Sequence, residues 1–234
     1  LTTTQLAALT PAQVAALTAT SLGTLGGASG LAIVASGTGS NVSAISSAST
    51  LTIGAVGATA SLTATAVGDN VYGIRAVGDM TIGQFAGSVT ASSTVWQGVG
   101  AYGLVSDTGS VTIGAFAETG RIRAEIASQE SYAVSGATGV TITGDLAGDI
   151  EAVSGVGFSI GSDAYGIYSS GGAVSIGAIA ETGSITALGE WSSSYGIWAS
   201  GDVAIGSMAG AISATSEMGT SAYGILSANG SITI

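Results

Sequence analysis

The sequence predicts an all-β fold, a parallel β-solenoid with about six turns, each of about 30 residues and three short strands. A first observation is that six of the seven tyrosines recur at nearly regular intervals along the chain. Two further short apolar runs also recur in nearly every interval, and Gly, Asp, Asn and Ser separate the runs. Self-similarity of this kind is typical of solenoids. The tyrosines are Tyr72, Tyr102, Tyr132, Tyr165, Tyr195 and Tyr223, with Ser43 in the same column upstream.

Each repeat contains three runs that read as strands. The first is "YGIRA" at residue 72 or "YGIWA" at 195, the second is "LTIG" at 51 or "VTIG" at 111, and the third is "LTA" at 62 or "IRA" at 122. Each run alternates with period two and is too short for a helix. One turn cannot bury its apolar face alone, so stacked turns about 4.8 Å apart supply the partner.

Strand alternation assigns the faces of these runs. We expect the tyrosine column to point inward, together with the isoleucines of the second run. Small residues of the third run are expected to fill a narrow corner of the core. The expected inward columns are Ile53, Ile82, Ile113, Ile142, Ile176 and Ile205, and the corner column is Ala64, Ala91, Ala124, Ala152, Ala187 and Ala214.

The N-terminal segment follows another rule. Residues 1–25 contain the octads "LTTTQLAA", "LTPAQVAA" and "LTATSLGT", in which Thr2 with Gln5 and Thr10 with Gln13 have capping-box spacing. They predict a repeat of short helical turns, and one continuous amphipathic helix is the alternative. Residues 26–42 are expected to be a transition or irregular first coil. Residues 43–234 are the expected solenoid, continuing beyond the fragment, because "SITI" ends in mid-pattern.

The octads carry a resemblance to a known group of proteins. "LTTTQLAALTPAQVAAL" resembles the Leu-Thr-x-x-Gln repeats of very large exported bacterial surface proteins of the adhesin or haemagglutinin-like type. The coils are similar to autotransporter-passenger and S-layer-type solenoids. The resemblance implies an extracellular or cell-surface location and a structural role as adhesin shaft, filament or surface-layer subunit. It implies no catalytic residue.

Composition excludes several functions. The chain has no His, no Cys and only three cations against 14 carboxylates, for a formal net charge of −11. We therefore expect no nucleic-acid binding, no nitrogen- or sulfur-ligated metal and no nucleophile–base pair. No apolar run is long enough to insert into a membrane. Asp145, Asp149 and Glu151 form the densest carboxylate cluster, but they lie in an ordinary turn, so no enzyme is expected and no cofactor is required.

Calcium is the one ion left open, because five aspartates follow glycine in turns rich in oxygen. The alternative is that Gly-Asp simply suits a tight turn. The candidates are Asp69, Asp79, Asp145, Asp149 and Asp202.

Two polar features of the surface add further expectations. Arg123 and Glu151 should form an ion pair between consecutive turns. A column of threonines raises ice binding as a lesser alternative, although Ser175 and Ala204 interrupt it and its neighbouring column is glycine. The threonines are Thr52, Thr81, Thr112, Thr141 and Thr233.

Outward aromatic residues are the candidate interaction surface. The outward positions of the tyrosine strand are Arg75, Val105, Ser135, Tyr168, Trp198 and Leu226, and they become apolar toward the C-terminus, at the last three. The corner after the third strand varies in length and displays Trp96 and Trp191, which either cap the core or contact a partner. The expected partners are other copies or coils of the same protein, or a surface glycan or other host or abiotic surface. A carbohydrate-binding or polysaccharide-active solenoid is the alternative function.

Overall fold

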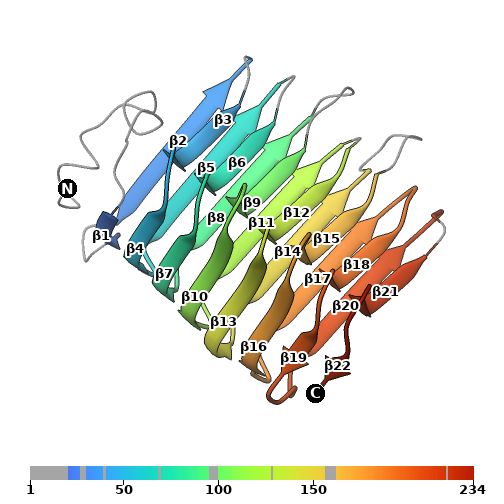
Figure 1. Ribbon diagram of the computed structural model, residues 1–234. Helices are drawn as coiled ribbons and strands as arrows, with labels where there is room; N and C mark the ends of the chain where they lie inside the picture. Colours follow the sequence, from blue (N-terminus) through green and yellow to red (C-terminus); the bar gives the residue numbers. More distant parts are fainter. Residues whose placement is uncertain are drawn as a thin grey trace.

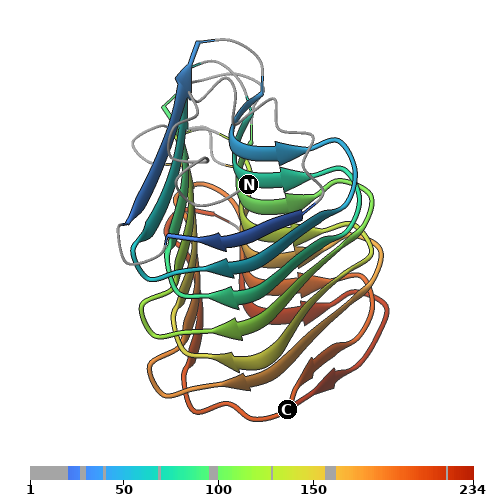
Figure 2. The ribbon, with the colours of Figure 1, turned by 90° about the vertical axis from the view of Figure 1, so that its left-hand side faces the viewer.

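The computed structural model describes residues 21–26, 30–38, 41–67, 70–94, 100–127, 129–155, 162–219 and 221–234. This part of the chain is a parallel β-solenoid of about seven turns, with roughly 29 residues per turn and no helix (Figures 1 and 2). The predicted all-β solenoid is confirmed, with one turn more than expected. A search of the described residues for a helix long and apolar enough to cross a membrane finds none.

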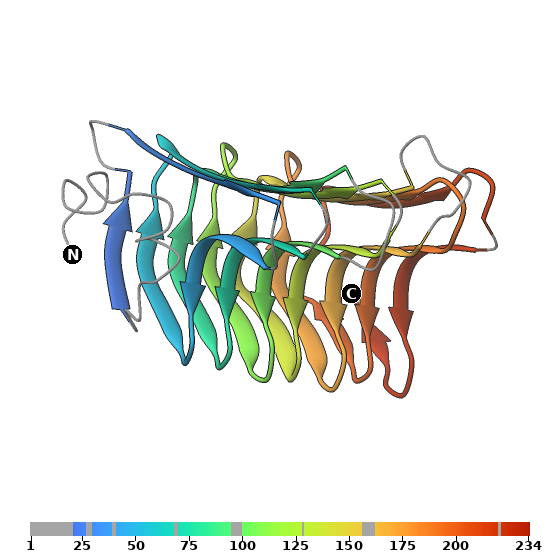
Figure 3. The same ribbon diagram turned by 90° about the horizontal axis from the view of Figure 1, so that it is seen from above.

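Three parallel sheets run the length of the stack, as Figure 3 shows from above. Sheet A contains β1 (Ser21–Leu25), β4 (Leu51–Val56), β7 (Met80–Phe85), β10 (Ser110–Phe116), β13 (Gly139–Leu146), β16 (Ala173–Ile179), β19 (Val203–Ile205) and β22 (Ile232–Thr233). Sheet B contains β2 (Leu31–Gly37), β5 (Ala60–Ala66), β8 (Ser88–Ser93), β11 (Arg121–Ile126), β14 (Asp149–Ser154), β17 (Ser184–Gly189) and β20 (Ala211–Ser216). Sheet C contains β3 (Val42–Ser47), β6 (Val71–Ala76), β9 (Ala101–Ser106), β12 (Ser131–Gly136), β15 (Ala164–Ser169), β18 (Ser194–Ala199) and β21 (Ala222–Ser227).

The regular ladders begin before residue 43, where the solenoid was expected to start. The third octad ends in strand β1 instead of a helical turn, because its register on β4 buries Leu22 and Leu25 against the core. The expected transition segment contains β2, which pairs with β5 over its whole length. Residues 1–20 lie outside the described residues, so the helical-turn repeat stays a prediction there.

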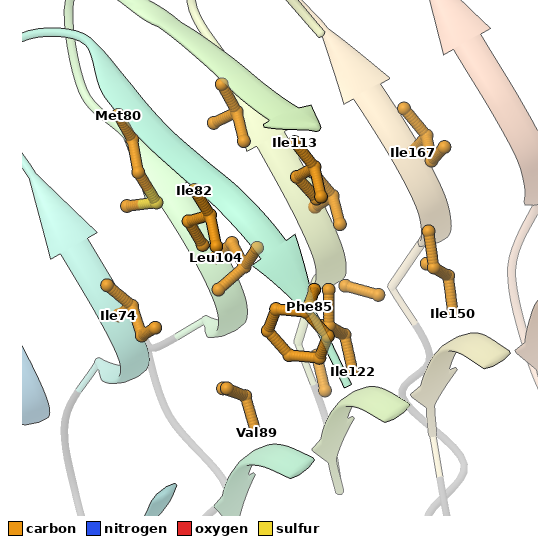
Figure 4. Close-up of a cluster of buried hydrophobic side chains, with 14 of the residues drawn as sticks. Ile74, Met80, Ile82, Phe85, Val89, Leu104, Ile113, Ile122, Ile150 and Ile167 are labelled. Atoms are coloured by element: carbon orange, nitrogen blue, oxygen red, sulfur yellow. The ribbon is translucent and has the colours of Figure 1, made fainter. Parts of the chain in front are cut away.

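Identical or similar side chains stack between turns in the core, and Figure 4 shows part of it. In sheet A, Phe85 and Phe116 stack with ring centroids 4.9 Å apart, and both are at most 1% exposed. The predicted isoleucine column is buried throughout. The predicted alanine column lies on the inner face of sheet B and is fully buried except at the half-buried Ala214 of the last turn. These two assignments of face are therefore confirmed.

The tyrosine column, in contrast, lies on the outer face of sheet C, so the expected inward orientation is wrong. In β6 both Val71 and Ile74 belong to the fully buried core, whereas Tyr72 does not. The Tyr72 ring lies instead 4.6 Å from the guanidinium carbon of Arg75. Strict alternation fails at Gly73, which also faces inward, because a Cβ there would lie 2.1 Å from the core atom Val89 Cγ1. Because Gly73 and Ile74 both face inward, Tyr72 faces outward, opposite to the face that strict alternation from Ile74 predicts.

Serine hydroxyls close the corner between sheets C and A. The Ser106 Oγ donates to the carbonyl oxygen of Gly78 in the preceding turn, at 2.8 Å. It also accepts the Gly109 amide at 3.0 Å. Ser169 and Ser227 accept the amides of Gly172 and Gly230 in the same way. One hydroxyl thus satisfies backbone groups that the corner removes from the ladders.

Two glycines on the outer face of sheet A should differ in how much an alanine substitution lowers the free energy of unfolding. A Cβ on Gly114 would lie 2.0 Å from the carbonyl oxygen of Gly83, and only separation of the two backbones can relieve that contact. We expect Gly114→Ala to lower the free energy of unfolding by about 1–3 kcal/mol, as overpacking does. Gly23→Ala is the matched control in the same sheet face, because nothing lies within 4 Å of its Cβ position. Urea unfolding followed by circular dichroism measures both, and equal stability of the two variants would contradict the steric argument.

Candidate functional site

All seven tyrosines of the chain lie on the outer face of sheet C. Six form one continuous stack along the solenoid, with neighbouring ring centroids 4.8–5.4 Å apart and interplanar angles of 3–16°. The cause is the register, since parallel in-register strands place the same position of each turn directly over the last. We call this set the tyrosine ladder: Tyr72, Tyr102, Tyr132, Tyr165, Tyr195 and Tyr223.

Polar residues just before the strands of sheet C hold several hydroxyls of the tyrosine ladder. The Tyr132 hydroxyl donates to Glu130 Oε2 at 2.5 Å, and the Tyr165 hydroxyl donates to Asp163 Oδ2 at 2.9 Å. The Tyr72 hydroxyl lies 3.4 Å from the amide oxygen of Asn41 in the preceding turn. Sequence reasoning missed these acceptors. The available signal was a polar residue two positions before the tyrosine column in most turns.

A second outward column, which contains two aromatic residues, lies beside the tyrosine ladder. The register confirms the predicted outward column Arg75, Val105, Ser135, Tyr168, Trp198 and Leu226. Tyr168 meets the rings of Tyr132 and Tyr165 edge to face, with centroids at 5.1 and 4.9 Å. Trp198 stacks on Tyr168 at 4.8 Å. Both are half-buried, so they pack on the ladder and also keep contact with solvent.

The structure describes one of the two predicted corner tryptophans. Trp191 is 37% exposed, just before β18. Trp96 lies outside the described residues. The assignment of these two tryptophans, together with Tyr168, Trp198 and Leu226, to an interaction surface stays a prediction.

A shallow groove of about 210 Å³ opens where the second column carries small residues. Tyr72 and Tyr102 line it, together with Val105 and Asp107 and several serines of neighbouring turns. Arg75 and Asp107 pair between turns, with the Arg75 Nε and Nη2 atoms 3.0 and 2.8 Å from Asp107 Oδ2. The groove therefore offers ring edges, hydroxyls and a paired carboxylate to a small polar ligand.

Burial raises the pKa of four phenols of the ladder, those of Tyr72, Tyr102, Tyr132 and Tyr165. Burial, with the nearby Tyr72 and Glu130, raises the pKa of Tyr102 to about 12. The pKa values of Tyr132 and Tyr165 are raised further, by burial first and then by the adjacent carboxylates Glu130 and Asp163. A tyrosinate is disfavoured there because it would lose hydration and face a negative charge.

Three of the aspartates proposed for calcium, Asp79, Asp149 and Asp202, accept hydrogen bonds from protein donors. Asp79 Oδ1 accepts the backbone amide and the hydroxyl of Ser110 in the next turn, at 2.8 and 2.9 Å. Asp202 Oδ1 holds Ser231 in the same way, at 2.7 and 2.9 Å. In the part of the chain that the structure describes, no three His, Cys, Asp or Glu side chains gather as metal ligands would. Asp69 lies outside the described residues, and calcium binding stays a prediction.

The carboxylate cluster noted in the sequence is divided between two sheets. Asp145 lies in β13 of sheet A, whereas Asp149 and Glu151 lie in β14 of sheet B. Asp149 Oδ2 pairs with Arg121 Nη2 at 2.9 Å, and its Oδ1 accepts the Ser184 hydroxyl at 2.7 Å. The structure thus does not bring the three carboxylates together.

All three arginines of the chain are paired. The predicted bond between Arg123 and Glu151 is confirmed, with Nη1 to Oε2 at 2.6 Å, and Glu125 of the same strand also pairs with Arg123 at 3.1 Å. These half-exposed pairs stabilise the fold little. The pairs do affect recognition. With all three arginines paired, no unpaired side-chain cation remains to attract an anionic polymer.

The Asp79–Ser110 contact gives a prediction at acid pH. The two hydrogen bonds from Ser110 lower the pKa of Asp79. A lowered pKa contributes stability that is present above the unfolded pKa of about 3.9 and is lost as the pH falls through the lower folded value. We expect Ser110→Ala to move the Asp79 pKa back toward its ordinary value in part, since the backbone bond remains. Carboxyl-detected NMR titration measures it, with Ser184→Ala as the control, and an unmoved Asp79 pKa would contradict the assignment.

No protein-family model, curated protein or solved structure matches this chain.

Proposed function

We propose that this chain is a stiff structural segment of an exported bacterial surface protein, acting as an adhesin shaft or as a subunit of a filament or surface layer. The observation that carries the proposal is the unbroken stacking of three parallel sheets through about seven turns. Every turn adds backbone bonds to the turn before it, so bending must strain all three ladders at once. The octads at residues 1–20 support export by resemblance alone.

Electron microscopy of the full chain tests this proposal. About seven turns at about 4.8 Å each span only about 34 Å, so we expect a single chain to be a short rigid particle and straight rods to form only where chains join end to end. Chains joined end to end or side by side would favour a filament or lattice, and separate short particles would favour a segment of a shaft. Extended flexible particles would overturn the structural role.

A variant pair tests self-association through Tyr168 and Trp198, the aromatic residues of the second column. If copies associate there, Trp198→Ser should lower the sedimentation coefficient of the assemblies. Leu188→Ser is the matched control, because Leu188 is a half-buried outward residue of sheet B. Equal association of both variants would exclude this column as the contact between copies.

Carbohydrate binding is the second candidate, and the groove beside Tyr72 and Tyr102 favours it. Its volume is below the range of drug-sized pockets, so one sugar ring of a neutral glycan is the fitting ligand class. Val105→Phe should fill the groove and abolish signals on a glycan array. Val153→Phe on the outer face of sheet B is the control, and a blank array for the unchanged chain would reject this candidate.

Ice binding stays the lesser candidate. The threonine column lies on the outer face of sheet A as predicted, and the register aligns Thr52, Thr81, Thr112 and Thr141. Thermal hysteresis of the purified chain is the measurement that decides it.

A further inference from the structure

We propose that Tyr132 and Tyr165, with the carboxylates of Glu130 and Asp163, form a redox-active site. At this site an oxidised transition-metal complex, acting as a one-electron outer-sphere oxidant, removes an electron while the phenolic proton moves to the carboxylate. The radical then passes between Tyr132 and Tyr165, because the proton returns to one phenol from its carboxylate as the other phenol gives its proton to its own carboxylate. This activity goes beyond the structural role proposed above and does not depend on it.

The step balances within the hydrogen bonds that the structure already contains. An outer-sphere oxidant takes one electron from the phenol ring and is reduced by one electron. The O–H bond of Tyr132 breaks, and its proton forms a new O–H bond on Glu130 Oε2, 2.5 Å away. The products are a neutral tyrosyl radical and a neutral carboxylic acid. Tyr165 and Asp163 repeat the arrangement one turn later, at 2.9 Å.

The proton acceptor distinguishes these two tyrosines from Tyr72. A phenol gives up its proton on oxidation, so a hydrogen-bonded carboxylate at the hydroxyl makes the oxidation easier. Tyr72 has the neutral amide oxygen of Asn41 as its partner, at 3.4 Å, and an amide is a much weaker base than a carboxylate. The two carboxylate-bonded rings are adjacent, with centroids 4.8 Å apart and planes within 3°.

Ring contacts connect this pair to its neighbours and to the surface. Tyr102 stacks on Tyr132 at 5.1 Å, and Tyr195 stacks on Tyr165 at 4.9 Å. Tyr168 touches both rings of the pair, and half-buried Trp198 stacks on Tyr168. An oxidant in solution therefore reaches the pair through two aromatic side chains, without entering the core.

Asp163 Oδ1 also accepts the Ser192 hydroxyl and the Ser193 amide, so this carboxylate has a structural role as well. Ring packing and that role do not require the bonds from the phenols to Asp163 Oδ2 and Glu130 Oε2. The two phenol–carboxylate bonds lie in consecutive turns. The aromatic residues of the second column are Tyr168, in the turn of Tyr165, and Trp198, one turn further on. The convergence of proton acceptors, stacked rings and a neighbouring surface aromatic pair is what points to electron transfer.

Laser-flash photolysis of the full chain with a photo-oxidised ruthenium polypyridyl complex tests the proposal. Transient absorption and electron paramagnetic resonance report the tyrosyl radical. The double variant Glu130→Gln and Asp163→Asn keeps acceptor oxygens but removes the bases. We expect radical formation to slow about tenfold, the value of one charge-assisted hydrogen bond. Glu181→Gln and Asp202→Asn, which change carboxylates away from the ladder, form the matched control and should leave the rate unchanged.

A second variant keeps the test decisive if the double variant unfolds. Tyr132→Phe with Tyr165→Phe preserves both rings and removes both phenolic protons, so the radical yield should fall while the fold persists by circular dichroism. The proposal is overturned if the native chain oxidises no faster than N-acetyl-tyrosinamide. It is also overturned if neither folded variant differs in radical rate or yield from the Glu181→Gln and Asp202→Asn control.

Discussion

Raising the pH from 10 to 12 is expected to unfold the solenoid cooperatively, with ionisation of Tyr102, Tyr132 and Tyr165 delayed until the turns separate. The pKa of Tyr102 is raised to about 12, and burial also raises the pKa values of Tyr132 and Tyr165. A raised pKa contributes stability that is fully present below the unfolded pKa of about 10 and is lost as the pH rises toward the folded value. Tyr102 alone accounts for up to about 2 kcal/mol of that loss after solvent screening.

The ladder makes the loss cumulative, because each tyrosinate would lie about 5 Å from the next ring and repel the next charge. Tyrosinate absorbance and circular dichroism, recorded together during alkaline titration, measure the coupling. We expect both signals to change in the same narrow pH interval. The Tyr132→Phe and Tyr165→Phe double variant should unfold at higher pH. Independent ionisation near pH 10 with unchanged circular dichroism would contradict the burial of the ladder.

Phe85→Ala is expected to lower the free energy of unfolding by about 3–5 kcal/mol, the cost of deleting a buried phenyl ring. Phe85 is fully buried and stacks on Phe116 at 4.9 Å, and its column continues through Val56 in the previous turn. A cavity at this level removes contacts from the turns above and below it. Urea unfolding followed by circular dichroism measures the change.

The chain contains its own control for this substitution. The same column carries Leu146 one turn beyond Phe116, so the site geometry accepts leucine. Phe85→Leu should therefore cost less than about 1.5 kcal/mol. If Phe85→Ala and Phe85→Leu destabilise equally, the loss comes from the aromatic stack and the cavity has no part in it.

The period of the sequence was sufficient to predict the fold. Runs such as "VTIG" and "IRA" alternate with period two, and their return once in every repeat allows only stacked turns to bury them. For the same reason the isoleucine, alanine and threonine columns were predicted with their correct faces. Arg123 with Glu151 followed from the register, because equivalent positions of consecutive turns must be neighbours.

The local rule failed where the backbone departs from regular alternation. An inward Gly73 followed by an inward Ile74 turns Tyr72 to the outer face, and no count by twos along "VYGIRA" shows it. The start of the ladders was missed for a related reason. Residues 21–42 lack the tyrosine that marks later turns. Leu22 and Leu25 are nevertheless buried in the core, because β1 pairs in register with β4.

The number of strands in each turn, the columns that stack and the absence of His, Cys and Lys chemistry all follow from the amino-acid sequence. These properties depend on composition and on spacing along the chain. Three features became visible only in the folded chain: the outer tyrosine ladder, the bonds from Tyr132 and Tyr165 to Glu130 and Asp163, and the groove beside Asp107. Those features depend on which side of a strand a residue faces and on contacts between turns, and one bend at a glycine is enough to change both.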